Sequence, residues 1–432
     1  MSKKLNLIYE WIGPHGPLTN NRIPTLVDLT ENFLEDIHLT QYKVKHDLIQ
    51  LPHFHTRFKD VVIRPSFNLP EGTFLYELNF NNFHYRDIHR AFDFSDGLLE
   101  NGKINSKVWD KIVHEKQGYF LITLLYEGYL QDKLLMAMTE YFIHKKVPLS
   151  QIIYVSNCYN GKEIYNSFCT RNNLTPEMKM EYLPVFRVDK TDIEFILKNT
   201  QKYTPGKKEK LFLCFNRRYN EHRILLYTVM SKLNLIDRCF YSMSKIQPES
   251  TNTYITNVSH ITSRYPILGI SKSDIDIADS RLPLILDTQN FSRYPMESSI
   301  NSVKHFYENS LINIVMETYF FNNIIHITEK TFKPIAFMQP FIMVAAPHSL
   351  QHVKDMGFKT FSDFWDESYD LELDHESRFL KIMTLLRNIS TWSDEKQIQF
   401  SNDVKSILEF NYHHLRTMHD KELDEFTENY GC

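Results

Sequence analysis

The sequence lacks any stretch of about 18 consecutive apolar residues, the length needed for a membrane-spanning helix. Its N-terminus, MSKKLNLIYEWIGPHG, contains only a brief apolar run that Asn6 and Glu10 interrupt, which is too short for the apolar core of a secretion signal. We therefore expect a soluble, cytoplasmic protein without a membrane span.

Cysteine is scarce. The five cysteines form no CxxC pair and are odd in number, which argues against a disulfide framework and a zinc knuckle. The histidine clusters at 53–55 and 413–414 have neither HExxH nor Cys/His zinc spacing, and DIDIAD at 274–279 is the nearest approach to a paired-carboxylate motif. We predict neither a metal site nor a cofactor.

A basic excess is also missing. The net charge of −4 argues against a dedicated polyanion-binding protein, which would carry a strongly basic face. What the sequence does have is 432 residues, 42% of them hydrophobic and 14% aromatic. Because single hydrophobic cores stop growing at about 250–300 residues, the length of this chain predicts two domains with a cleft between them.

Short apolar runs alternate with helical patterns, which is typical of parallel βαβ construction and predicts an α/β fold. The segment QDKLLMAMTEYFIHKK, residues 131–146, has apolar residues at helical spacing and end charges that suit the helix dipole. The predicted strands are 5–9, 119–125, 152–155, 210–215, 283–286, 312–316 and 341–344.

The domain boundary is predicted in KYTPGKKEK, where proline, glycine and a run of charges precede a new apolar strand. This gives an N-terminal domain at 1–205 and a C-terminal domain at 206–392. The remaining segment, 393–432, has the apolar spacing of helices and no strand of its own, so we expect it to pack across both domains.

An arginine-rich corner lies in KLFLCFNRRYNEHRILLYTVMSKL, which reads as a strand, a polar turn and a helix. Arg217 and Arg218 occupy the turn, and Arg223 follows in the first part of the helix. Helix N-termini have unpaired N–H groups, and guanidinium groups bind phosphate oxygens through paired hydrogen bonds. In the absence of a glycine-rich loop, we predict that these arginines bind an anion; the alternative is a solvated loop.

The stretch IHITEKTFKPIAFMQPFI begins at residue 325 and places charges where a strand would meet a helix. Residues 324–327 are predicted to be a strand end, with Thr328 as the N-cap of a helix that starts with Glu329 and Lys330. Open α/β sheets bind ligands at the carboxyl ends of their strands. We therefore predict that Glu329 accepts hydrogen bonds from a ribose diol and that Lys330 neutralises a diphosphate; the alternative for Glu329 is a carboxylate favoured by the helix dipole.

A longer stretch, IVMETYFFNNIIHITEKTFKPIAFMQPFIMV, resembles the donor-binding region of α-1,3-fucosyltransferases and related GT-B glycosyltransferases. In that region a "FEN" element is followed by a [Y]-[IV]-T-E-K element, a helix and an apolar strand. The resemblance implies two Rossmann-like domains, a nucleotide-sugar donor held mainly by the C-terminal one, and inverting transfer without a bound metal.

Taken position by position, the resemblance makes Glu329 the ribose contact and Lys330 a diphosphate contact, and it places Glu317 near the transferred sugar. One of the three arginines would bind the donor phosphate. The sequence departs from the pattern at His326, where the family often has tyrosine, and at Thr318, which replaces the asparagine of "FEN". The interval between the two glutamates is also longer than usual, so the base and the sugar do not carry over.

An inverting enzyme of this kind needs a general base from the N-terminal domain, worth roughly 10²–10⁴ in rate. We favour Glu127, which follows a strong strand and precedes Gly128, and then His15 and Glu10 in the turn after the first strand. Each has a structural alternative, as a helix-capping carboxylate or as a loop histidine.

Two other functions remain open from the sequence. In a retaining GT-B enzyme, Glu317 and Glu329 would act as paired glutamates, and a nucleotide-sugar- or glycan-binding protein would have lost turnover. The acceptor is equally open: its hydroxyl group belongs to a glycan, a protein, a small molecule or a hydroxylated base in DNA. The sequence does not specify an oligomeric state.

Overall fold

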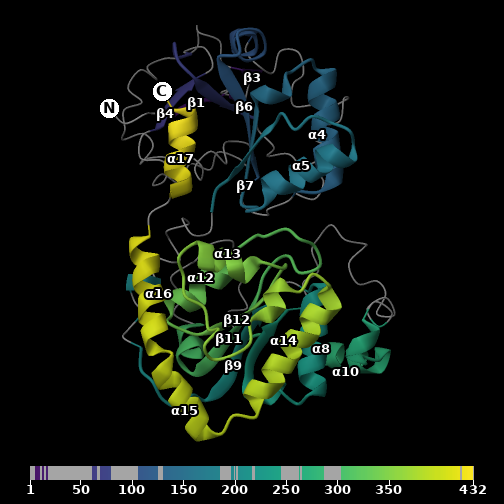
Figure 1. The fold of residues 1–432 in the computed structure, drawn as a ribbon, viewed down its shortest axis with the longest axis vertical. Helices are drawn as coiled ribbons and strands as arrows, with labels where there is room; N and C mark the ends of the chain where they lie inside the picture. The colour runs from purple at the N-terminus through teal and green to yellow at the C-terminus, as the bar shows by residue number, and fades with distance from the viewer. Residues whose placement is uncertain are drawn as a thin grey trace. The chain divides into compact units, whose positions relative to one another are not determined.

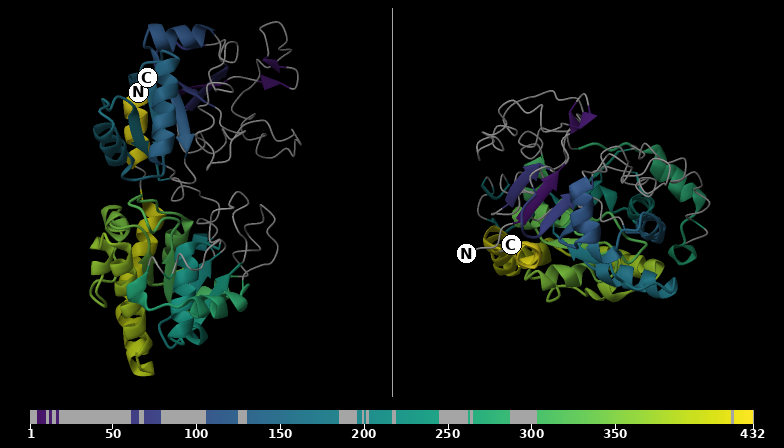
Figure 2. Two further views of the ribbon diagram at one scale, coloured as in Figure 1. Left: turned by 90° about the vertical axis from the view of Figure 1, so that its right-hand side faces the viewer. Right: turned by 90° about the horizontal axis from the view of Figure 1, so that it is seen from above.

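The computed structural model describes residues 5–9, 12–13, 16–17, 61–65, 69–78, 106–124, 130–184, 196–198, 200, 203–216, 219–244, 262, 265–286, 303–418 and 421–431. The chain divides into two compact units. The first comprises Met1–Leu183 together with Asp420–Cys432, and the second comprises Pro184–His419. Each unit contains a parallel sheet with helices (Figures 1 and 2), so the predicted α/β class is confirmed. The GT-B arrangement with a cleft stays a prediction.

The first unit has a six-stranded, fully parallel sheet in the order β4-β1-β5-β6-β7-β8. Its strands are β1 Leu5–Tyr9, β4 Val61–Pro65, β5 Phe74–Glu77, β6 Gly118–Leu124, β7 Ile152–Ser156 and β8 Lys179–Tyr182, and a small hairpin joins β2 Ile12–Gly13 to β3 Gly16–Pro17. The helices are α3 Ser106–Trp109, which continues as a π-helix over Asp110–His114, α4 Asp132–His144, a 3-10 turn at Leu149–Gln151, α5 Gly161–Arg171 and α17 Lys421–Tyr430.

The second unit has a four-stranded parallel sheet in the order β10-β9-β11-β12. Its strands are β9 Lys210–Asn216, β10 Cys239–Met243, β11 Ser310–Met316 and β12 Phe341–Val344. The α-helices are α8 Glu221–Lys232, α10 Lys272–Ser280, α12 Glu329–Ala336, α13 Ser349–Asp355, α14 His375–Ser390, α15 Asp394–Asp403 and α16 Lys405–Thr417, and 3-10 turns lie at Ile236–Arg238, Pro266–Leu268 and Ser368–Leu371.

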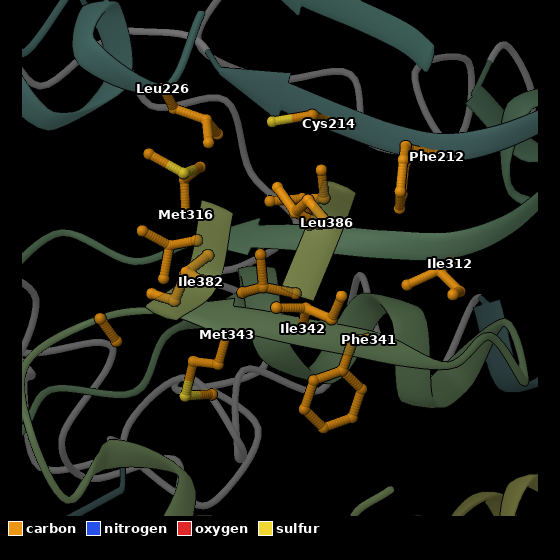
Figure 3. Packing of buried hydrophobic residues seen from close by; sticks show 14 of the residues in the cluster. Phe212, Cys214, Leu226, Ile312, Met316, Phe341, Ile342, Met343, Ile382 and Leu386 are labelled. Carbon is orange, nitrogen blue, oxygen red and sulfur yellow. The ribbon is translucent and has the colours of Figure 1, made fainter. Parts of the chain in front are cut away.

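The core of the second unit lies on both faces of this sheet, because its strands are apolar almost throughout, as expected for a parallel sheet covered on two sides. Phe212 of β9 lies opposite Ile312 of β11 in the parallel pairing of these two strands. Figure 3 shows these strand side chains gathered with Ile382 and Leu386 of α14, and Leu226 of α8 next to Cys214.

The helices α8 and α12 lie on opposite sides of the sheet (Figure 1). The reason is topological: α8 leads from β9 to its neighbour on one side, whereas α12 leads from β11 to its neighbour on the other side. Since such crossovers are right-handed, the two helices cover opposite faces. Both begin at the edge where the parallel strands end.

The segment before β9 belongs to the second unit, and not to the N-terminal domain that the sequence predicted to end at 205. Ile196 is buried in the core of the second unit and Tyr203 packs against it. The hydroxyl of Tyr412 in α16 donates to the Leu197 carbonyl over 2.7 Å. The first unit therefore ends at Leu183, upstream of the charged run.

The C-terminal segment 393–432, predicted to pack across both domains, contributes helices to both units. Helices α15 and α16 belong to the second unit, and α17 belongs to the first. In α17 the Tyr430 hydroxyl donates to Glu181, and its ring lies 5.6 Å from the ring of Tyr119. The two units are therefore connected by the chain twice, once near residue 184 and once near residue 419.

Most predicted elements form. Strands 5–9 and 341–344 have the predicted bounds, and β6, β7, β9, β11 and α4 match within one or two residues. Two predictions are wrong. Residues 283–286 contribute an isolated antiparallel bridge between Leu284 and Met243, and 324–327 are not a strand. Among the described strands, the sequence analysis missed β2, β3, β4, β5, β8 and β10.

None of the described helices is both long and apolar enough to cross a lipid bilayer.

The parallel pairing of β5 and β6 requires a glycine at position 118. A Cβ atom there would lie 2.7 Å from the ring of Phe74, which is fully buried and directly opposite. We expect Gly118→Ala to lower the free energy of unfolding of the first unit by about 1–3 kcal/mol, the usual cost of overpacking. Hydrogen exchange of the β6 amides, measured at increasing denaturant concentration, reports this change.

Gly161→Ala is the matched control, because a Cβ atom at this helical position would meet its nearest neighbour, Leu130, at an ordinary 3.5 Å. We expect this variant to be neutral or slightly more stable, since alanine favours helix. Equal destabilisation by the two substitutions would contradict the packing assigned to Gly118.

Candidate functional site

The strand order of the second unit reverses between β9 and β11. From β9 the chain moves to β10 on one side and then to β11 on the other. Open α/β sheets bind ligands outside the carboxyl ends of the two strands that flank such a reversal. Here those ends are Asn216 of β9 and Met316 of β11, and the first turns of α8 and α12 begin nearby.

Glu317, the residue after β11, is completely buried, and both of its carboxylate oxygens accept hydrogen bonds. One oxygen, Oε1, accepts from the Thr328 backbone N–H at 3.0 Å and from the Thr331 hydroxyl at 2.7 Å. The other, Oε2, accepts from the Thr328 hydroxyl at 2.7 Å. The carboxylate that the resemblance places near the transferred sugar thus ties the start of α12 to the end of β11.

Thr328 is the N-cap of α12, as predicted. Its hydroxyl accepts from the backbone N–H of Lys330 at 3.3 Å and from the Lys330 ammonium at 2.9 Å. The same ammonium lies 3.9 Å from Glu317 Oε2 and 3.7 Å from Glu329 Oε1. The Lys330 side chain is 28% exposed, and its ammonium is held by the Thr328 hydroxyl.

Glu329 opens the first turn of α12, with a side chain that is 32% exposed. Burial raises the pKa of this carboxyl, but the charges of Lys330 and Lys333, together with hydrogen bonds to the carboxylate, outweigh that effect and hold the pKa at about 2. Glu329 is therefore ionised at neutral pH and acts as a hydrogen-bond acceptor. The irregular backbone of 324–327 leads to this position, so Glu329 and Lys330 reach the carboxyl edge through the Glu317 contacts and not as the continuation of a strand.

Among the described residues, the helices α8, α12 and α13 begin at this edge of the sheet, and they differ in how their N-termini are satisfied. The first N–H groups of α13 receive the Asp370 carboxylate, at 2.9 Å from both Leu350 N and Gln351 N. The N-terminus of α12 has the Thr328 hydroxyl. At α8, the N-cap residue Asn220 makes no side-chain capping bond within the described part of the chain. Among the described residues, the N-terminus of α8 thus lacks a capping side chain, while Glu221 places a carboxylate in its first turn.

Arg223 is only 4% exposed, and its Nη2 lies 3.4 Å from the Met316 carbonyl, which ties α8 to β11. The adjacent His222 donates from Nε2 to the Glu317 carbonyl at 3.1 Å, and its ring stacks on Phe320 at 6.0 Å. Burial, together with the charge of Arg223, lowers the pKa of His222 to about 3. A neutral imidazole therefore holds the backbone of Glu317 from the α8 side.

His326, at the position where the family often has tyrosine, is 2% exposed and packs against Tyr319 with the ring centres 5.7 Å apart. It lies within the buried loop that leads to α12.

Arg217 and Arg218, between β9 and α8 in the sequence, lie outside the described residues, as do Glu10, His15 and Glu127. The strands that precede the last three are described. In the first unit β1 leads toward Glu10 and His15, and β6 leads toward Glu127. The strand order also reverses at β1, between β4 and β5, so Glu10 and His15 follow the strand at which the first unit would bind a ligand.

The sequence analysis missed three residues of this site: His222, Thr331 and Asn216. Asn216 is 4% exposed and donates from Nδ2 to the Tyr241 hydroxyl at 3.3 Å, while its Oδ1 accepts no hydrogen bond from the described residues. Thr331 had a local signal, since it stands three residues after the N-cap. His222 and Asn216 had none, because their roles depend on neighbours that the fold brings from elsewhere.

A pocket of about 260 Å³ lies at the opposite, amino end of β9, β11 and β12. Its walls include Tyr203, Lys208, Tyr307 and Phe337, and the last two rings stack with their centres 4.2 Å apart. This pocket is separated from Glu317 and Lys330 by the length of the strands, so it is not part of the site at the carboxyl edge.

Within the described ranges, no group of three or more His, Cys, Asp or Glu side chains is arranged to hold a metal ion. The DIDIAD stretch forms most of α10. Its first aspartate, Asp274, completes a capping box with Ser271 and pairs with Lys232 at 2.9 Å. The carboxylate that most resembled a metal ligand in the sequence therefore caps a helix.

No family model and no curated protein matches this chain. Among solved structures, the chain is similar to that of apo UGT2 from Phytolacca americana, with 8% identity over 99% of this chain and 98% of the other and a TM-score of 0.31. A similarity at this level carries no argument about function, which therefore rests on the site itself.

The buried His222 predicts a specific pH dependence. Its pKa in the folded protein, about 3, is below the ordinary 6.5, so the unfolded chain binds the extra proton first. The stability that depends on the neutral ring is complete above pH 6.5 and falls as the pH decreases from 6.5 toward 3. We expect the stability difference between the wild type and His222→Gln to shrink over this range, as measured by urea denaturation at several pH values. A difference that stays constant with pH would contradict the assignment.

Proposed function

We propose that this protein is a glycosyltransferase that moves a sugar from a nucleoside-diphosphate donor to an acceptor hydroxyl. The observation that carries the proposal is the ionised Glu329 beside the Lys330 ammonium on the first turn of α12, fixed by Glu317 at the edge where the strand order reverses. The resemblance of this stretch to the donor-binding region of α-1,3-fucosyltransferases supports the same function.

In this proposal, the two faces of the sheet each contribute a helix to the donor. Glu329, from α12, accepts hydrogen bonds from the ribose diol. The diphosphate receives the N–H groups at the start of α8, the Lys330 ammonium, and Arg217 and Arg218 from the preceding turn. Arg223 supports α8 from within the core, since its side chain is buried.

The reaction is a single displacement at the anomeric carbon. A general base removes the proton from the acceptor hydroxyl, whose oxygen then bonds to the anomeric carbon on the side opposite the diphosphate. The bond between the anomeric carbon and the diphosphate oxygen breaks, and its electron pair leaves with the nucleoside diphosphate. Cations at the diphosphate stabilise this charge as it develops. Glu127 is the proposed base, with His15 and Glu10 as the alternatives.

The geometry of Glu317 favours inversion over retention. A retaining enzyme with Glu317 and Glu329 as paired glutamates would need the Glu317 carboxylate at the reacting sugar. That carboxylate is fully buried and already accepts three hydrogen bonds from Thr328 and Thr331. Proton NMR of the anomeric configuration of the product distinguishes the two reactions.

Nucleotide binding tests the donor site. A ligand at 100 times its Kd raises the free energy of unfolding by about 2.7 kcal/mol, which a thermal-shift assay resolves. We expect a panel of nucleoside diphosphates and nucleotide-sugars to contain at least one that raises the Tm of the wild type. That shift should be strongly reduced in Lys330→Ala, Arg218→Ala and Glu329→Gln, which remove a diphosphate or ribose contact.

Lys381→Ala provides the control, because Lys381 is an exposed lysine of the same unit that pairs with Glu372 at 2.9 Å on the surface. It should leave the ligand-induced shift unchanged. Ligand-induced shifts that persist undiminished in all three site variants would refute the donor site. Binding without transfer to any acceptor and without slow hydrolysis of the donor would indicate a binding protein instead of an enzyme.

A further inference from the structure

We propose that Glu317 is a positioning residue for the donor diphosphate: its buried carboxylate, acting through the hydroxyl of Thr328, holds the Lys330 ammonium in place. This inference rests on the proposed function and assigns Glu317 a role different from the contact with the transferred sugar that the resemblance implies. Glu317 itself touches no donor atom in this account.

The argument begins with the hydrogen-bonding capacity of one hydroxyl. A threonine hydroxyl has one proton to donate and two lone pairs that accept. The Thr328 hydroxyl donates its proton to Glu317 Oε2 at 2.7 Å. Both lone pairs are then turned toward Lys330, to its backbone N–H at 3.3 Å and to its ammonium at 2.9 Å. The carboxylate therefore fixes the direction in which Thr328 can hold Lys330.

The second step is the rigidity of the carboxylate. The Glu317 backbone N–H donates to the Val344 carbonyl at 3.1 Å, and its carbonyl accepts from His222 at 3.1 Å. The residue is thus bound to β12 on one side and to α8 on the other, and its side chain is fully enclosed. The position of Lys330 is consequently fixed, through Glu317, relative to β11, β12 and α8.

The third step is a substitution that keeps the shape of the Glu317 side chain but turns the hydrogen-bond acceptor at Oε2 into a donor. In Glu317→Gln the amide oxygen takes the Oε1 position, because the Thr328 N–H and the Thr331 hydroxyl both donate there. The amide NH₂ then occupies the Oε2 position and donates to the Thr328 hydroxyl. Three donors compete for two lone pairs, and the Lys330 ammonium, as the group with access to solvent, is displaced.

A first experiment uses the protein without ligand. The rate at which acetic anhydride acetylates Lys330, relative to Lys381 in the same sample, reports how firmly the ammonium is held, and peptide mass spectrometry measures it. We expect the ratio to rise several-fold in Glu317→Gln and in Thr328→Val, which removes the hydroxyl, and to stay at the wild-type value in Thr328→Ser, which restores it. An unchanged ratio in the two disrupting variants overturns the inference.

A second experiment uses calorimetric titration with GDP, UDP and their sugar forms GDP-fucose and UDP-glucose. If Glu317 acts through Lys330, Glu317→Gln weakens the binding of a nucleoside diphosphate and of its sugar form by the same factor. We expect about tenfold, the effect of losing one charge-assisted hydrogen bond. In the Lys330→Ala background the same substitution should cost nothing more.

Two outcomes separate the possible failures. Weaker binding of the sugar form alone, persisting in the Lys330→Ala background, would show that Glu317 contacts the sugar and would overturn the positioning role while leaving the proposed function intact. Failure of the wild type to bind any nucleotide or nucleotide-sugar would reject the proposed function, and the acetylation ratio would still decide whether Glu317 positions Lys330.

Discussion

A fully buried carboxylate must have its oxygens occupied, and in this protein that requirement determines the geometry of the candidate site. Glu317 has no access to water, and leaving a buried charge without partners would cost several kcal/mol. Thr328 and Thr331 meet the requirement, and they do so only when α12 begins beside the end of β11. The partly exposed charges of Glu329 and Lys330 are presented at the sheet edge as a consequence.

The same edge is electrostatically asymmetric. Asp370 neutralises the N-terminus of α13, and Thr328 caps that of α12, whereas α8 begins without a side-chain cap among the described residues. The backbone N–H groups at the start of α8, next to the Glu221 carboxylate, and the partly exposed Lys330 ammonium both lie at the reversal of strand order. The neutral His222 and the buried Arg223 connect α8 to the backbone at the end of β11, so the two sides of the site are structurally coupled.

Local signals in the sequence were sufficient for the fold class, for strands such as β9, β11 and β12, and for Thr328 as a helix cap, because apolar runs and capping residues act over a few positions. Residues 324–327, three isoleucines and His326, satisfied the same rule and yet are not a strand. They lead to the start of α12, which Glu317 fixes by its contacts with Thr328, eleven residues away. The role of Glu317 was not predictable for the same reason. The short strands β5 and β10 were missed because their pairing with β6 and β9, and not their composition, makes them strands.

A crystal structure of the protein with a bound nucleoside diphosphate, either GDP or UDP, tests the central claim most directly. The account predicts the diphosphate oxygens within hydrogen-bonding distance of the Lys330 ammonium and of the first N–H groups of α8, with the ribose hydroxyls at Glu329. A nucleotide bound at the amino end of the strands, among Tyr203, Lys208 and Phe337, with the carboxyl edge empty, would contradict it.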